Sequence, residues 1–228
     1  MGRNMGKLLL KVSAMLLVAM ILSGLPVVQA LPGEIELIGK LWDHDPITVY
    51  IHASPKFQVY IEHVLKALND WSSALEDTSG NTVDNSEIGV ADPDGVFDFQ
   101  IVDSRKDADI VIHIHGGAYA GVLGMTILQD KDRDGYFDKV RISVKIGPGA
   151  GLEDFRNVVR HEIGHALGLG HETTDDSDLM DPTYDASAIG EDIYPSDLDI
   201  AALLHIYYDD GFGLPNIPPE EIPETYSA

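Results

Sequence analysis

The chain has 228 residues, a formal net charge of −23 at pH 7 and no cysteine. This length suits one domain with a targeting segment, and it is ample for a buried core. The lack of cysteine excludes disulfides and thiolate chemistry. The negative charge opposes attraction to nucleic acid and to anionic lipid, so we expect neither nucleic acid nor a lipid surface as a partner.

Residues 1–30 have the features of an export signal. Three basic side chains precede an apolar stretch, and Val28-Gln29-Ala30 places small residues before a cleavage point. We therefore predict a signal peptide over 1–30 and a secreted, extracellular protein. Cleavage would remove three positive and no negative charges, leaving −26. The apolar run is short for a membrane span, so membrane attachment is expected only if the segment stays uncleaved.

Residues 31–45 form a lead-in without a strong signal, and we place the folded domain at 46–210. The β-branched and aromatic run Ile47–Ile51 predicts a strand. Ser54-Pro55 then suits a helix start. The helix that follows is predicted from apolar side chains that recur every three or four residues, namely Ile61, Val64, Leu68, Trp71 and Leu75.

Polar residues dominate 76–95, which we interpret as a long loop. Alternation over 97–101 and again over 110–114 predicts two strands. His113 and His115 share one face of the second strand and could form a second metal pair. Such histidines are more often solvated or hydrogen-bonded, and we favour that interpretation. A further strand is predicted over 122–128.

The stretch 130–138 places carboxylates at alternating positions before a glycine, a pattern that suits calcium. Its first three aspartates match the first three ligand positions of an EF-hand loop, and Asp138 matches the ninth. Arg141 stands where the bidentate glutamate would be, and an acidic turn between strands is the alternative. We favour calcium, because closely spaced carboxylates repel one another without a cation. The candidate ligands are Asp130, Asp132, Asp134, Tyr136 and Asp138.

After a clear strand pattern over 140–146 and a glycine-rich loop comes His161-Glu162-x-x-His165-x-x-Gly168-x-x-His171. Residues four apart share a helix face, so His161 and His165 can bind one zinc ion. Gly168 tolerates the left-handed conformation that ends a helix, so His171 can return as a third ligand. Three neutral histidines and a water make an open, catalytic site, where Glu162 can take a proton from the zinc-bound water.

A second motif, Leu-Met-Asp-Pro-Thr-Tyr over 179–184, follows His171 by a short interval. Together the two motifs resemble the metzincin zinc peptidases, and the short interval with Leu-Met-x-Pro-x-Tyr is similar to the matrixin branch. Glu172 is a departure that resembles astacins, but astacins place a tyrosine where this chain has Pro182. The resemblance covers roughly 41–208.

This resemblance implies a metzincin α/β fold. It has a twisted, mixed, five-stranded sheet, two long helices, and a Met-turn followed by a C-terminal helix. An extended protein or peptide substrate would pair with the sheet edge at 122–128. By the same resemblance, Met180 lies beneath the metal, and Pro182 to Tyr184 form a pocket wall. A capping box at Ser196-x-x-Asp199 predicts the start of the last helix. The acidic, proline-containing tail 211–228 is predicted to be loose.

The leading functional hypothesis is a secreted, monomeric zinc endopeptidase with Glu162 as general base. One alternative is a zinc-binding fold without activity, against which the intact Glu162 argues. The other is a calcium-dependent binding or adhesion module with a structural zinc. A closed structural site would need a fourth protein ligand, and cysteine is absent.

Overall fold

The computed structural model describes residues 33–78, 98–117, 121–182, 190–207 and 217–227, all within the unit Pro32–Ala228. The predicted export signal, most of the predicted loop at 76–95, and Tyr184 lie outside the described residues. Among the helices that are described, none combines the length and the apolar character that crossing a membrane requires.

The main sheet has the order β3 (Phe99–Ile101), β2 (Ile47–Ala53), β4 (Ile110–Gly116), β7 (Lys139–Ile146) and β5 (Val122–Leu123), and β6 (Thr126–Gln129) also pairs with β7. The first four strands are parallel, whereas β5 and β6 run antiparallel to β7. Both keep one register on β7, so together they form a single interrupted edge strand. The predicted mixed sheet with five strand positions is confirmed, as is a sheet edge over 122–128.

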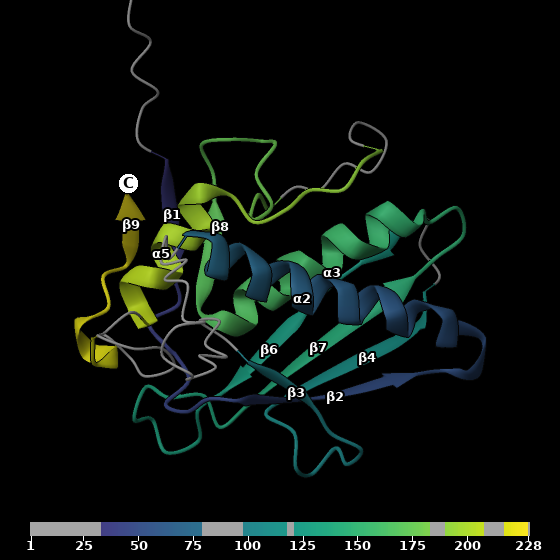
Figure 1. The fold of residues 1–228 in the computed structure, drawn as a ribbon, viewed down its shortest axis with the longest axis horizontal. Helices are drawn as coiled ribbons and strands as arrows, with labels where there is room; N and C mark the ends of the chain where they lie inside the picture. Colours follow the sequence, from purple (N-terminus) through teal and green to yellow (C-terminus); the bar gives the residue numbers. More distant parts are fainter. Residues whose placement is uncertain (1–32, 79–97, 118–120, 183–189, 208–216, 228) are drawn as a thin grey trace, which may run out of the picture. The chain divides into compact units, whose positions relative to one another are not determined.

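Alternation in the strands explains which face of this sheet is covered. In β7 every second side chain is buried, as with Ile142 and Val144, and in β4 Ile110, Ile112 and Ile114 are buried on the same face. Helices α2 (Ile61–Thr78) and α3 (Leu152–Leu167) lie across the sheet and pack against each other (Figure 1). The Trp71 indole of α2 is buried and donates a hydrogen bond to the Arg160 carbonyl of α3 at 2.9 Å. The two helices are therefore joined by a specific contact as well as by apolar packing.

The start of the first helical segment differs from the prediction in detail. Helical turns begin after Ser54 as predicted, but the first six residues form the 3-10 helix η1 (Pro55–Tyr60), and the Ser54 side chain makes no capping hydrogen bond. The α-helix itself begins at Ile61.

A second, three-stranded antiparallel sheet has the order β8 (Leu169–Glu172), β1 (Glu34–Leu37), β9 (Thr225–Ser227). The lead-in therefore contains a strand that the sequence reading missed. The expectation of a loose tail is wrong for the described residues 217–227, which include η3 (Pro219–Glu221) as well as β9. Both strands are short, and each pairs with a segment that is distant in the sequence: β1 pairs with β8, and β9 pairs with β1.

The predicted C-terminal helix is present as α5 (Asp197–Tyr207). Its capping box forms as expected: Ser196 N–H donates to the Asp199 carboxylate at 2.9 Å, and Asp199 N–H donates to the Ser196 hydroxyl at 3.2 Å.

Candidate metal centre and substrate cleft

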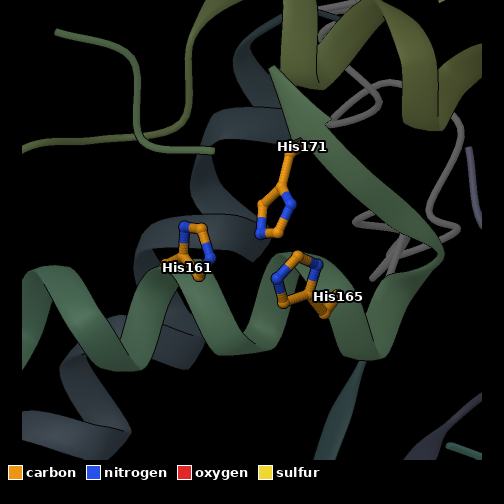
Figure 2. A group of neighbouring side chains, drawn as sticks. All are labelled: His161, His165 and His171. Atoms are coloured by element: carbon orange, nitrogen blue, oxygen red, sulfur yellow. The ribbon is translucent and has the colours of Figure 1, made fainter. Parts of the chain in front are cut away.

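Helix α3 and strand β8 bring three histidines together. His161 and His165 lie one turn apart on α3, which ends at Gly168 in the left-handed conformation with φ 112°. The chain then turns into β8, and His171 points from that strand toward the two rings on the helix (Figure 2). The predicted role of Gly168 in returning the third histidine is consistent with this geometry.

The three imidazoles fit one metal ion. Their ligand nitrogens lie within 4.8 Å of one another. His161 Nδ1 donates to the Leu179 carbonyl at 2.8 Å and His165 Nδ1 donates to the Leu169 carbonyl at 2.9 Å, because a carbonyl can only accept. This arrangement fixes the tautomer and leaves Nε2 free to bind a metal.

Burial keeps the two helical rings neutral. It lowers the pKa of His161, and it lowers the pKa of His165 to about 4, with His161 as a neighbouring charge that adds to the effect. A metal ligand must be unprotonated, so burial prepares both rings for binding near neutral pH.

Glu162 lies beside the histidines and is 6% exposed. Burial raises its pKa to about 7, against the opposing effect of a hydrogen bond from the Thr126 hydroxyl at 2.5 Å. A carboxyl group with a pKa near the working pH is suited to general acid–base chemistry. The sequence motif identified Glu162, but nothing in the sequence indicated Thr126 as its partner.

The Met-turn packs directly against α3. Met180 is fully buried, and its amide donates to the Asp178 carboxylate at 2.7 Å. Gly164 lies between His161 and His165 in the sequence. A Cβ atom placed on it would lie 2.5 Å from Met180 Sδ, so the Met180 thioether occupies the space that a side chain at this position would need. The Glu172 amide donates to the Met180 carbonyl at 3.1 Å, which joins the Met-turn to β8.

A pocket of about 320 Å³ opens beside Glu162. Its walls come from the edge strand, from α3, from the Met-turn segment and from the segment before α5. The lining residues are Val122, Leu123, Gly124, Asn157, Val158, His161, Glu162, Leu179, Asp181, Pro182 and Ile193. Pro182 lines this pocket, and its role as a wall for a substrate side chain stays a prediction.

The wall at Ile193 is anchored by polar contacts that sequence reasoning missed. Asn157, one turn before His161 on α3, accepts the Ile193 amide at 2.8 Å and donates to the Glu191 carbonyl at 2.8 Å. Arg156 makes two hydrogen bonds to Asp192, at 2.6 and 2.7 Å, which lower the pKa of that carboxyl to about 2. The helical spacing from His161 was the available signal for Asn157.

Residues 42–208 match the sequence profile of the matrixin family. This match covers most of the chain and includes the histidines, the Met-turn and both long helices. The chain belongs to the matrixin family. Matrixins are zinc-dependent peptidases, and the trio of neutral imidazoles fits that metal. A comparison with curated proteins gave no match.

The aspartate loop of this matrixin brings together three of its five candidate calcium ligands. Carboxylate oxygens of Asp130, Asp132 and Asp134 lie within 4.8 Å of one another. Asp130 also pairs with Lys40. Asp138 instead accepts the Lys131 amide at 2.6 Å, and the Tyr136 amide donates to Asp134 at 2.9 Å.

The pair at His113 and His115 belongs to no metal-capable group of three or more within the described residues. His115 Nε2 lies 3.0 Å from the Ser143 hydroxyl, and the His113 ring lies 5.1 Å from the ring of His52. His115 is therefore hydrogen-bonded and His113 lies against a second histidine ring, and the absence of a metal from this pair stays a prediction.

Glu172, the departure from the matrixin pattern, has a local structural role. Its carboxylate is 1% exposed and accepts the amides of Thr174 and Asp175 at 2.7 and 2.8 Å. The Thr174 hydroxyl also donates to it. These bonds fix the chain as it leaves β8, immediately after His171.

Proposed function

We propose that this matrixin is a secreted zinc endopeptidase in which Glu162 is the general base. The observation that carries the proposal is that three imidazoles and a buried carboxylate lie together beside a pocket, and that the edge strand of the main sheet forms one wall of this pocket. The histidine and Met-turn motifs alone would also fit an inactive relative. The buried carboxylate beside the metal-binding nitrogens is what favours catalysis.

His161, His165 and His171 would hold the zinc ion, which when bound supplies Lewis-acid activation of water and of the scissile carbonyl. Glu162 accepts a proton from the attacking water and delivers it to the departing amine. Burial raises the pKa of Glu162, which favours its uptake of this proton.

The edge strand offers its main chain to an extended substrate. Met125 exchanges both backbone hydrogen bonds with Ser143 of β7, at 3.0 and 2.9 Å. In an antiparallel ladder the bonding direction alternates, so the amide and carbonyl groups of Gly124 and Thr126 face away from β7. A polypeptide strand can pair there and place one side chain in the pocket beside Pro182. Binding along the middle of a chain, rather than at its end, fits an endopeptidase.

Two variants test this function on unstructured casein. His165→Ala should lose both zinc and cleavage, whereas Glu162→Ala should keep one zinc per chain and lose cleavage. Metal content is measured on the purified proteins and cleavage by fragment release. Equal loss of zinc in both variants would make Glu162 a ligand. Full zinc without cleavage in the parent protein would favour the inactive fold or the calcium-dependent binding module.

Secretion rests on the signal features of residues 1–30. The exported protein should begin near Leu31 and be active without further trimming. Sequencing the amino terminus of the secreted protein, alongside an activity assay of the same sample, checks this expectation. Activity that appears only after a cut beyond residue 45 would contradict it.

We also propose that the loop 130–138 binds calcium, supported by the three carboxylates that lie close together there. A cation bound only by the folded state stabilises it by about 2.7 kcal/mol at a hundredfold excess over its dissociation constant. Millimolar calcium should therefore raise the melting temperature with zinc kept saturating. Asp132→Ala combined with Asp134→Ala should remove most of the rise and leave zinc content unchanged. An equal rise in both proteins would reduce the loop to an acidic turn.

A further inference from the structure

The carboxylate of Glu162 contacts the edge strand at two positions. The Thr126 hydroxyl lies 2.5 Å from Glu162 Oε2 and 3.1 Å from the main-chain oxygen of the same residue. A Cβ atom on Gly124 would lie 2.1 Å from Oε1 and 2.6 Å from Cγ of Glu162. Thr126 thus donates a hydrogen bond to Oε2 of Glu162, and the missing side chain of Gly124 leaves room for Oε1.

The register of the strand explains why these two residues reach the carboxylate. Thr126 lies opposite Ile142 of β7, a buried side chain on the face that the helices cover. Side chains alternate along a strand, so Gly124 shares this face. Met125 and Ile127 point to the other face and are 49% and 45% exposed. The two positions that contact Glu162 are therefore the two that the sheet directs toward α3.

We propose that Thr126 is a positioning residue that holds the Glu162 carboxylate in its working orientation, with Gly124 providing the space for that orientation. This inference rests on the proposed role of Glu162 as general base. Within the described residues, no other side chain donates a hydrogen bond to this carboxylate. The same residues of the strand also turn their main-chain groups toward the substrate, so a substrate that pairs with the strand is aligned with the base.

A hydroxyl suits this task because it can both donate and accept. It donates to Oε2 while Glu162 is a carboxylate. When Oε2 carries the transferred proton, the hydroxyl can accept that proton in a hydrogen bond and donate its own to the Glu162 main-chain oxygen. The contact therefore persists through both halves of the proton transfer. A valine of the same shape would offer neither interaction.

Steady-state kinetics on a peptide substrate, with zinc content and melting temperature for every variant, test the inference. Thr126→Val should lower kcat by roughly tenfold to a hundredfold, the size expected for losing one hydrogen bond to a charged group. KM, zinc content and melting temperature should stay close to those of the parent. Thr126→Ser keeps the hydroxyl and should restore most of kcat. Gly124→Ala should also lower kcat, because its methyl group displaces the carboxylate.

Ile101→Ala is the matched control, since it changes an exposed apolar side chain of β3 at the opposite edge of the same sheet and should leave kcat unchanged. Parental kcat in Thr126→Val would overturn the inference. So would a Thr126→Ser variant as slow as Thr126→Val, because the loss would then come from packing. If Thr126→Val does not fold, the comparison of Thr126→Ala with Thr126→Ser decides in the same way. Activity retained in Glu162→Ala would instead overturn the proposed function.

Discussion

Asp199 is a carboxylate with no exposed surface in the first turn of α5. Its Oδ2 atom accepts the Ser196 amide, whereas Oδ1 is buried without a hydrogen-bond partner among the described residues. Burial raises the pKa of Asp199 to about 8, and the negative charges of Asp178 and Glu172 act in the same direction. We therefore predict that the folded protein retains a proton on this side chain near neutral pH.

This retained proton makes stability depend on pH. An unfolded aspartate has a pKa of about 3.9. Between about pH 4 and 8 the folded state binds the extra proton, so the free energy of unfolding falls as pH rises through that range. Asp199→Asn mimics the protonated form and should remove this contribution. Urea unfolding at several pH values, with zinc saturating, should show that the free energy of unfolding of the variant increases relative to that of the parent as pH rises.

Asp197→Asn supplies the control for this prediction. Asp197 lies in the same turn of α5 but is exposed, so its variant should keep the pH dependence of the parent. If the Asp199→Asn and parent curves run parallel across the whole range, Asp199 is ionised in the folded protein. A cationic partner outside the described residues would then be required.

At the scale of whole elements, the contact between α3 and the Met-turn depends on Gly164, a glycine within the zinc motif. A Cβ atom on Gly164 would lie 2.5 Å from Met180 Sδ and 3.1 Å from the Trp71 ring. Three segments of the chain thus meet at this glycine: α2 through Trp71, the Met-turn through Met180, and α3 itself. Because α3 also carries His161 and His165, this contact fixes the Met-turn against the helix that supplies two of the three histidines.

Gly164→Ala sets two effects against each other. Helix propensity favours alanine over glycine by about 1 kcal/mol. Overpacking a tight core typically costs about 1 to 3 kcal/mol, and a separation of 2.5 Å requires movement of the Met-turn. We therefore expect net destabilisation, by up to about 2 kcal/mol, together with faster zinc loss to a chelator. Urea unfolding and a zinc-release assay measure the two effects.

A double variant identifies the cause. Gly164→Ala combined with Met180→Ala should be more stable than the sum of the two single effects predicts, since the smaller side chain makes room for the added methyl group. Strict additivity would place the strain elsewhere, and a stabilised Gly164→Ala would show that propensity outweighs packing.

Long or strongly patterned elements could be predicted from the sequence, because their signal is local. The alternation in β7, the apolar stripe of α2 and the fixed spacing of His161 and His165 each report on one segment alone. Gly124 and Thr126 could not be assigned roles from pattern, because their contacts depend on how distant segments pack. Helical spacing places Asn157 one turn before His161, but its partners also lie on a distant segment. The strands β1 and β9 were missed for a similar reason. Four and three residues are too few for alternation to distinguish a strand, and both strands pair with segments far along the chain.

At the scale of the whole molecule, the small sheet connects both ends of the domain to the metal centre. Strand β1 lies between β8, which carries His171, and β9 near the C-terminus. The Leu37 amide donates to the Glu224 carbonyl at 2.8 Å, and the Tyr226 ring lies 5.2 Å from the ring of His205 on α5. Pro219 packs at Gly135, where a Cβ atom would lie 2.2 Å from it. The C-terminal segment therefore contacts the aspartate loop, α5 and β1.

Deleting residues 217–228 should destabilise the domain and weaken the hold on His171. The deletion removes the strand that covers the outer edge of β1, along with the packing of Tyr226 and Pro219. A loss of about 2 to 4 kcal/mol would lower the melting temperature by roughly 5 to 15 °C for a domain of this size. Zinc should also dissociate faster, because β8 depends on β1 for its edge pairing. Calorimetry and zinc release to a chelator, compared with the parent, check both parts.

Glu220→Ala with Glu221→Ala, which changes only exposed charges in η3, should leave both quantities unchanged. A truncated protein that melts at the parental temperature and keeps its zinc equally well would mean that β9 is an unimportant addition to the sheet.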